Sequence, residues 1–162
     1  MPGLYYEQYE IDKIIRHNMS RTVTDTDNLL FTSLCMNTQP LHLSEEFAKG
    51  TIYGERLVTS VFTIGLTMGM SVADTVEGTS LGNLGIDSIT FPTPVYIGDT
   101  LRAESIITDR RRSKSRPMTG IVSFVHRSYN QRDELVVDIA RKGLAMCLYE
   151  TDEDAERELG RA

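Results

Sequence analysis

The segment that decides the fold is L-V-T-S-V-F-T-I-G-L-T-M-G-M-S-V-A, residues 57–73. It is the most hydrophobic segment of the chain and is apolar nearly all round, which predicts a helix that is buried on most sides. Gly65 and Gly69 lie four residues apart, on one face of this helix, where they would let another segment pack closely. Because each glycine costs about 1 kcal/mol in helix propensity relative to alanine, we expect that close packing to be important.

Strand patterns follow the helix, and shorter elements precede it. The strands predicted from alternation and turn residues are 80–90, 101–108, 120–129 and 135–147, with a hairpin at 130–133. Before the helix we expect a tyrosine-rich start, a strand at 21–24, a helix capped by Asp25 or Thr26, and a short helix opened by Ser44. One long helix followed by long antiparallel strands predicts an α+β fold in which a curved sheet wraps around the helix.

The composition is that of an ordinary globular domain. The chain has 162 residues, of which 40% are hydrophobic and 25% charged, and its net charge of −6 argues against non-specific binding of nucleic acid. No segment has the roughly 18 apolar residues of a membrane span, and the start lacks the features of a signal peptide. We therefore expect a cytoplasmic protein with no membrane partner, made of a single domain at 1–150 and a polar tail at 151–162.

Two motifs lie on either side of the helix. C-M-N-T-Q-P-L-H, residues 35–42, ends in a histidine after a Pro-Leu pair, and F-P-T-P-V-Y-I-G-D, residues 91–99, joins two predicted strands. With the layout of residues 5–147, these motifs resemble the MaoC-like branch of the hot-dog fold, the (R)-specific enoyl-CoA hydratases and related dehydratases. The family's hydratase motif runs approximately S-G-D-x-N-P-L-H, so the family aspartate falls on Asn37 and the family asparagine on Gln39.

The resemblance implies a catalytic set of Asn37, His42 and Ser60. In the family, an aspartate and a histidine add water to an enoyl thioester, and a backbone N–H at the start of the central helix forms the oxyanion hole. At the matching spacing, that N–H belongs to Ser60. An imidazole can take a proton from water and deliver one to carbon near neutral pH, so His42 is the predicted acid and base.

An amide at Asn37 cannot take up a proton, and three interpretations stay open. In the first, Asn37 positions the water and His42 alone carries the proton. In the second, another carboxylate supplies the missing function, with Glu46, Glu55 and Asp87 as candidates. In the third, the site is inactive and the protein binds an acyl thioester without converting it.

The one basic cluster of the chain is predicted to be a loop between two strands, with Arg110, Arg111, Arg112, Lys114 and Arg116. Residues 112–117 resemble the loop of a subset that acts on short branched or dicarboxylic enoyl-CoA thioesters such as mesaconyl-CoA. We predict that Arg112, Lys114 and Arg116 bind the phosphates of coenzyme A, because guanidinium and ammonium groups recognise phosphate. The alternative is a solvated charged turn.

Two residues of the loop before the helix, Tyr53 and Arg56, are further predicted to contact the substrate. Arg56 or Arg21 is the conjectured partner of a distal carboxylate, if the acyl chain carries one. We expect no metal, and no cofactor apart from the coenzyme A of the substrate, because the thioester itself activates the double bond.

The function predicted from these residues is a hydratase or dehydratase that interconverts a short 2-enoyl-CoA, branched or dicarboxylic, and its 3-hydroxyacyl-CoA. The alternatives are a non-catalytic acyl-CoA-binding protein and a hot-dog thioesterase in which Glu55 activates water. The fold resemblance also implies a homodimer, in which the sheets of two subunits join edge to edge, or a higher homo-oligomer.

The remaining histidines and the cysteines are predicted to be structural. His126 lies inside an alternating strand, and His17 in a polar turn with no functional signal. Cys35 and Cys147 form neither a CxxC motif nor a Cys/His metal spacing, so we expect buried thiols in a reducing compartment.

Overall fold

The computed structural model describes residues 3–160, which form five strands, five α-helices and one 3-10 turn at Tyr6–Gln8. The strands are β1 (Ile14–Thr22), β2 (Ser80–Thr90), β3 (Thr100–Arg112), β4 (Thr119–Tyr129) and β5 (Leu135–Met146). The helices are α1 (Asp25–Leu34), α2 (Pro40–Leu43), α3 (Glu45–Lys49), α4 (Ser60–Thr75) and α5 (Asp152–Leu159).

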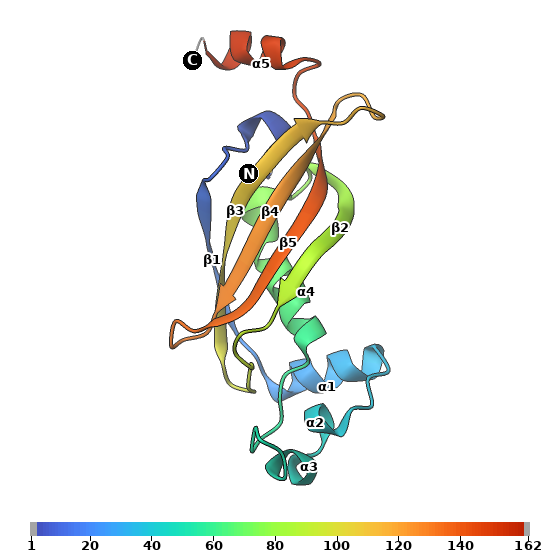
Figure 1. The fold of residues 1–162 in the computed structure, drawn as a ribbon, viewed down its shortest axis with the longest axis vertical. Coiled ribbons are helices and arrows are strands. Elements are labelled where there is room, and N and C mark those ends of the chain that lie inside the picture. The colour runs from blue at the N-terminus through green and yellow to red at the C-terminus, as the bar shows by residue number, and fades with distance from the viewer. Residues whose placement is uncertain (1–2, 161–162) are drawn as a thin grey trace.

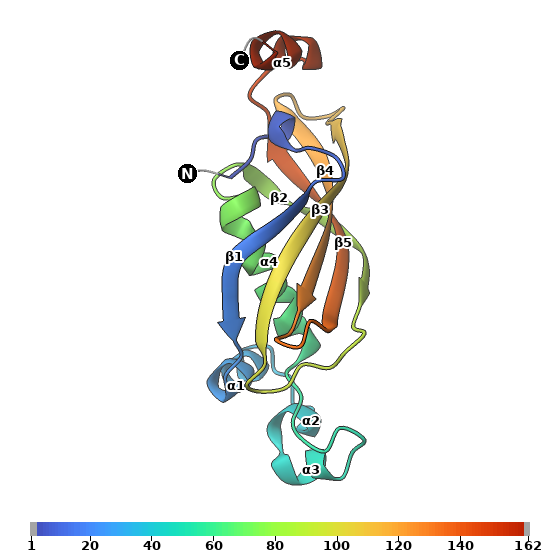
Figure 2. The ribbon, with the colours of Figure 1, turned by 90° about the vertical axis from the view of Figure 1, so that its left-hand side faces the viewer.

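The strands form one sheet in the order β1-β3-β4-β5-β2, and every neighbouring pair is antiparallel (Figure 1). The sheet curves around α4, which runs along its concave face (Figure 2). Val23, Leu101 and Ile139 are fully buried in the core between the helix and the sheet. The prediction of an α+β fold with a curved sheet around a long helix is confirmed.

The central helix differs from the prediction in its start and in its burial. It begins at Ser60, because Thr59 has an extended backbone and acts as the N-cap. The face that packs on the sheet is largely polar: Thr63, Thr67 and Thr75 are buried there, and the Thr67 hydroxyl donates to the Thr63 carbonyl at 2.8 Å.

The opposite face of α4 leaves Val61 56% exposed and Val72 40% exposed. Gly65 and Gly69 lie on this face, and a methyl group added at either would meet nothing within 4 Å. The prediction of a helix buried on most sides is therefore wrong for the single chain. The close packing that the two glycines predict is not made by the described part of this chain.

The N-terminal third departs most from the sequence prediction. The first strand runs from Ile14 to Thr22, well before the expected 21–24, and His17 lies buried in it instead of in a polar turn. Thr24, not Asp25 or Thr26, caps α1, because its hydroxyl accepts the Asp27 N–H. Ser44 caps α3 as predicted.

Two other predictions need correction. Cys35 is exposed at the end of α1, whereas Cys147 is buried as expected, in a cluster with Tyr6, Tyr9 and Phe124. The strand predicted at 101–108 extends to Arg112, so three of the five residues of the basic cluster belong to a strand and only 113–118 form the loop.

The C-terminal tail is helical over Asp152–Leu159 and is anchored to the body. Thr151 caps it, Ala155 is buried, and Arg112 pairs with Asp152 at 2.7 Å. The last two residues of the predicted tail lie outside the described residues. Within residues 3–160, none of the helices combines the length and the apolar character needed to cross a membrane.

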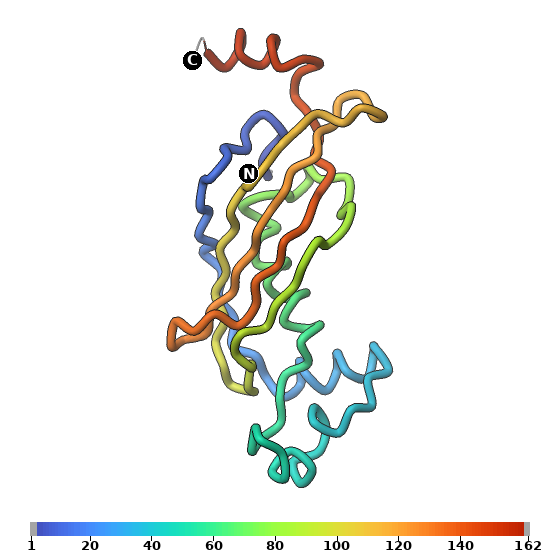
Figure 3. The backbone as a smooth tube through the Cα atoms, viewed as in Figure 1, coloured from blue at the N-terminus to red at the C-terminus, as the bar shows by residue number. Residues whose placement is uncertain are grey.

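The backbone trace in Figure 3 shows that the two segments with predicted site residues lie at opposite ends of the sheet. The segment α1–α3 projects from one end of the sheet, beside the start of α4. The loop between β3 and β4 and the helix α5 lie at the other end.

Candidate active site

A cavity of about 340 Å³ lies at the N-terminal end of α4. His42 and Tyr53 line one part of it, and Ser60 and Thr63 contribute from the first turn of α4. The segment 91–95, which its two prolines keep extended, lines a further part together with Leu57, Val58 and Val136. The two sequence motifs therefore meet at one cavity although about fifty residues separate them.

His42 is held with one ring nitrogen fixed. It lies in α2, a single helical turn that begins at Pro40, and its Nδ1 lies 2.9 Å from the carbonyl oxygen of Leu57. A carbonyl can only accept a hydrogen bond, so Nδ1 carries the proton and Nε2 has the free lone pair in the neutral ring. His42 lines the cavity with the tautomer that a general base needs.

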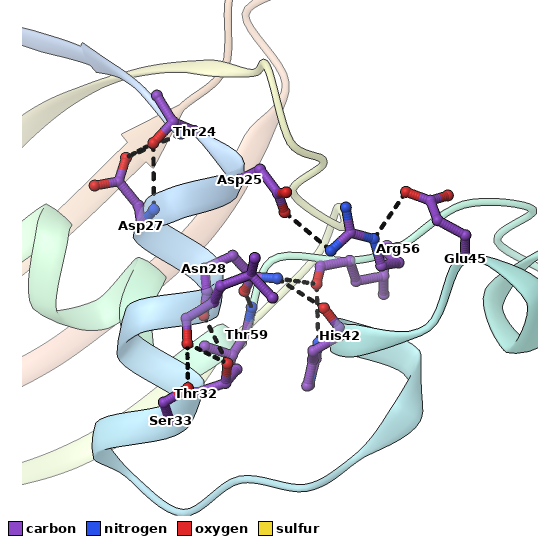
Figure 4. A network of polar contacts seen from close by, with 12 residues as sticks. Thr24, Asp25, Asp27, Asn28, Thr32, Ser33, His42, Glu45, Arg56 and Thr59 are labelled. Atoms are coloured by element: carbon purple, nitrogen blue, oxygen red, sulfur yellow. Dashed lines mark hydrogen bonds and ion pairs between the residues drawn. The ribbon is translucent and has the colours of Figure 1, made fainter.

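A buried asparagine, Asn28, organises this corner (Figure 4). Its side-chain nitrogen donates to the carbonyl oxygens of His42 at 3.0 Å and Leu57 at 3.4 Å, and its side-chain oxygen accepts the Thr59 N–H at 3.1 Å. Asn28 thereby ties α1 to both α2 and the residue before α4. Sequence reasoning missed it, because the only signal was a polar residue next to the apolar positions of the predicted helix.

Asn37 contacts the same segment from the other side. The left-handed backbone of Met36, with φ of 54°, turns the chain back, and the Asn37 N–H donates to the Thr32 carbonyl at 2.8 Å. The Asn37 side-chain nitrogen lies 3.5 Å from the Thr59 hydroxyl, and its oxygen accepts the Gln39 N–H at 3.1 Å. Asn37 and His42 thus both reach the segment that leads into α4, but of the two only His42 is among the described residues that line the cavity.

Ser60 is the first residue of α4 and lines the cavity. The first N–H groups of a helix have no partner within it, and the helix dipole gives this end a partial positive charge. Among residues 3–160 no acceptor is found for the Ser60 N–H, so it is available to an oxyanion in the cavity.

Arg56 serves as a structural brace in the described chain. Its guanidinium pairs with Asp25 and with Glu45, each at 2.9 Å, and so links α1 to α3 (Figure 4). The hydrogen bond to Asp25 is the main cause that raises the pKa of Arg56. Arg21 is likewise paired, with Asp27. Neither arginine lines the cavity.

The three carboxylates predicted as possible second bases do not line the cavity that His42 lines. Glu46 and Glu55 are exposed and do not line the cavity, and Asp87 pairs with Lys142 at 2.7 Å on the sheet. Among the described residues that line the cavity, there is no aspartate or glutamate. The polar groups that face it come from His42, Tyr53, Ser60 and threonines.

The basic cluster lies at the end of β3 and in the loop after it, at the opposite end of the molecule from α2, which holds His42 (Figure 1). Arg112 is engaged by Glu7, by Asp152 and by the Tyr149 carbonyl. Lys114 and Arg116 are exposed in the loop after β3. Within one chain, the structure therefore does not bring these cations to the cavity.

The fold and the cavity together define a class of protein. A curved antiparallel sheet wrapped on one long helix is the arrangement of a hot-dog-fold protein. A Mycobacterium tuberculosis protein with a double hot-dog fold has the same fold, with a TM-score of 0.79 at 17% identity over 92% of this chain and 46% of that chain. The model of the MaoC like domain matches residues 7–129, and the chain belongs to this family.

Two relatives are similar over most of this chain. It is 30% identical over 139 residues to the mesaconyl-CoA hydratase of Cereibacter sphaeroides and 32% identical over 141 residues to the beta-methylmalyl-CoA dehydratase of Chloroflexus aurantiacus. Each match covers 86% of this chain but only 40% and 39% of those relatives, so the chain spans about two fifths of their length.

A solved structure of a MaoC domain dehydratase from Chloroflexus aurantiacus has a TM-score of 0.86 and 29% identity to this chain. That match covers 93% of this chain and 42% of the other. The two curated relatives, the family model and this structure agree on the family.

Proposed function

We propose that this protein is a hydratase or dehydratase that interconverts a short 2-enoyl-CoA and its 3-hydroxyacyl-CoA. The observation that carries the proposal is the contact of His42 Nδ1 with the Leu57 carbonyl, which leaves Nε2 as the unprotonated nitrogen of a neutral ring at a cavity that Ser60, the first residue of α4, also lines. The names of the two curated relatives support the same chemistry and a short acyl chain, branched or dicarboxylic.

The reaction follows from these two groups. His42 Nε2 takes a proton from water as the water oxygen bonds to Cβ, and the π electrons of the double bond move towards the thioester oxygen. The Ser60 N–H donates to the resulting enolate oxygen, an effect worth about 2.7–4 kcal/mol in a studied hydrolase. The imidazolium then returns its proton to Cα, so one water has been added and the base is regenerated.

In this proposal Asn37, which is not among the described residues that line the cavity of one chain, takes the role of water holder beside Thr59, whose hydroxyl lies 3.5 Å from its side-chain nitrogen. Its amide can accept a hydrogen bond from water and donate one, but it cannot carry the proton. One general acid or base is typically worth 10²–10⁴-fold in rate, so a site with His42 alone is slower than one with two such groups. The absence of a carboxylate from the described lining argues against a second base and against a thioesterase that uses Glu55.

We also propose that two chains pair through β2. This edge strand leaves Leu81, Leu84 and Ile86 exposed. They lie next to the face of α4 that carries Gly65 and Gly69, which no other described segment covers. The other edge, β1, carries Arg16 and a register shift between Arg16 and Ser20, features that discourage edge pairing. A two-fold axis at β2 would join the sheets and cover the apolar face.

Such a dimer also changes the prediction for the basic cluster. Antiparallel pairing of β2 with its copy sets opposite ends of the two chains side by side. The loop that carries Lys114 and Arg116 in one chain would then lie on the same side as the His42 cavity of the other, where coenzyme A phosphates extend. Arg112 stabilises that loop through its contacts with Glu7 and Asp152.

The test follows the absorbance of the enoyl thioester with crotonyl-CoA and mesaconyl-CoA. We expect turnover by the wild type, loss of turnover in His42→Ala, and a rate at least about tenfold higher in Asn37→Asp, which restores a second proton-carrying group. Binding of both thioesters without conversion by either the wild type or Asn37→Asp would instead identify a non-catalytic acyl-CoA-binding protein.

A further inference from the structure

A second polar cluster lies near the C-terminal end of α4, away from the His42 cavity at its N-terminal end. His17, Ser105, His126 and Arg141 form a row across β1, β3, β4 and β5, and Asp74 of α4 closes one end. The distances along the row are 2.9 Å from Asp74 to His17, 2.7 Å to Ser105, 2.6 Å to His126 and 2.8 Å to Arg141. All four sheet residues are buried.

Arg141 decides which group donates and which accepts in each hydrogen bond along this row. Arg141 Nε can only donate, so His126 Nε2 accepts and the Nδ1–H of His126 donates to Ser105. If every hydrogen has an acceptor, the Ser105 hydroxyl then donates to His17 and the Nδ1–H of His17 donates to Asp74. Burial, and after it the charge of Arg141, lowers the pKa of His126 to about 3, which agrees with a neutral ring.

The row uses only the Nε of Arg141 and leaves its two terminal nitrogens without a hydrogen-bond acceptor among residues 3–160. Arg141 is 5% exposed and is in no ion pair with a described residue, although most other arginines of the described chain have a carboxylate partner. The guanidinium carbon lies 4.4 Å from the Phe124 ring centroid. A largely buried cation without an anion is costly. The terminal nitrogens of Arg141 are not among the fully buried atoms that lack a partner, so they are open to a carboxylate or phosphate in the adjoining cavity.

Arg141 lines a cavity of about 370 Å³ between α4 and β2. The walls are Met68, Gly69 and Val72 of the helix and Leu81 and Gly82 of the strand, so the space next to the guanidinium is mostly apolar. Gly143 keeps room for the guanidinium, because a methyl group there would lie 3.0 Å from Nη1. A planar cation at the end of an apolar pocket suits the carboxylate of an acyl chain.

This cavity is too far from the reaction centre of its own chain. Gly69 follows Ser60 by nine residues, which is about 13–14 Å along a helix, longer than a four- or five-carbon acyl chain. In a two-fold dimer through β2, however, the Phe91 end of one strand lies beside the Ser80 end of the other. Phe91 lines the His42 cavity and Ser80 lines the Arg141 cavity, so the two cavities would adjoin across the interface.

We propose that Arg141 of one chain binds the distal carboxylate of a dicarboxylic enoyl-CoA held in the His42 cavity of the second chain. This inference rests on the proposed hydratase function and its β2 dimer. It assigns the carboxylate to Arg141 in place of Arg21 and Arg56, whose guanidinium groups are already paired.

The first experiment measures kcat/KM of Arg141→Met for mesaconyl-CoA and crotonyl-CoA. Loss of one partner of a buried charge pair predicts a fall of roughly 30-fold or more for mesaconyl-CoA, with little change for crotonyl-CoA, which has no distal carboxylate. Arg141→Lys should lose less. Asp74→Asn, which breaks the far end of the same row, should leave the ratio of the two substrates unchanged. A fall that is equal for both substrates in Arg141→Met would overturn the inference.

Binding of unreactive thioesters separates this inference from the proposed function. The wild type should bind succinyl-CoA more tightly than butyryl-CoA, and Arg141→Met should lose that preference. If this holds without any turnover of enoyl-CoA, the carboxylate site stands and the hydratase proposal fails. If enoyl-CoA is hydrated but the preference is absent or independent of Arg141, the function stands and the carboxylate site fails.

Mixed dimers test whether the arginine acts across the interface. A dimer of Arg141→Met with His42→Ala has one site with both wild-type groups only if Arg141 serves the other chain. Random mixing then restores about one quarter of the wild-type activity on mesaconyl-CoA, because half of the dimers are mixed and each has one complete site. No recovery above the separate variants would rule out the arrangement across the interface.

Discussion

His42 and His126 are both held by hydrogen bonds, but they differ in what is left free. His42 is half-buried, has one nitrogen fixed by the Leu57 carbonyl and turns the other to a cavity. His126 is fully buried, uses both nitrogens, and stacks on Phe124 with ring centroids 5.4 Å apart. The difference teaches that a histidine available for chemistry is recognised by its unused nitrogen, and not by burial or by the number of its contacts.

The difference between the two histidines is tested most directly by replacing His42. Replacing it with alanine should lower kcat by about 10²–10⁴-fold, because it removes the only imidazole among the described residues that line the cavity, and that lining holds no carboxylate. The free energy of unfolding should fall by only about 0.5–1.5 kcal/mol, the value of one hydrogen bond. Steady-state kinetics on crotonyl-CoA and urea denaturation measure the two quantities. An unaltered kcat with a large loss of stability would contradict this prediction and show that His42, like His126, is structural.

His126→Leu should show the opposite pattern. It leaves the buried Arg141 Nε–H without an acceptor, at about 1–3 kcal/mol, and removes the hydrogen bond that Ser105 accepts from His126, at about 0.5–1.5 kcal/mol, so the free energy of unfolding should fall by about 1.5–4.5 kcal/mol. The kcat of the folded fraction on crotonyl-CoA should stay near that of the wild type. Urea denaturation at pH 7 with parallel assays checks this, and a specific loss of kcat at full stability would contradict it.

The pH dependence of stability sharpens the same contrast. The pKa of His126 is about 3 in the folded protein and about 6.5 when unfolded, so the unfolded chain binds more protons between these values. The stabilisation is therefore complete above pH 6.5 and is lost as the pH falls, by about 3 kcal/mol between pH 7 and pH 4. Denaturation curves across this range measure the slope, which should be shallower in His126→Leu.

The smallest expected change in stability and rate comes from replacing Asn28, which holds the backbone around His42. Asn28→Ala removes the hydrogen bonds to His42, Leu57 and Thr59 and should lower the free energy of unfolding by about 1–3 kcal/mol. It should also lower kcat, because the imidazole and the start of α4 lose their common support. Thr32→Val is the matched control, since Thr32 is buried in the same helix but its hydroxyl bonds only within α1. Equal kcat in both variants would mean that Asn28 does not position the site.

The comparison also shows why the sequence indicated the role of His42 but not the hydrogen-bond partners of His126. His42 was located by a local motif, and the Pro-Leu pair before it does form the turn that holds the ring. His126 was correctly predicted to be structural, but its partners come from strands 21 residues before it and 15 after it. Alternation along one strand shows which side chains point inward, but not which strand lies next to it.

The sequence by itself determined the long apolar helix, the paired strands after it, the Ser44 cap and the family motifs, since these depend on neighbours within a few residues. The tertiary structure alone decided the strand order, the burial of His17, the bracing by Asn28 and Arg56, and the position of Arg141 at a second cavity. These depend on which distant segments lie side by side, and that is fixed by the packing of the whole sheet on α4, not by local propensity.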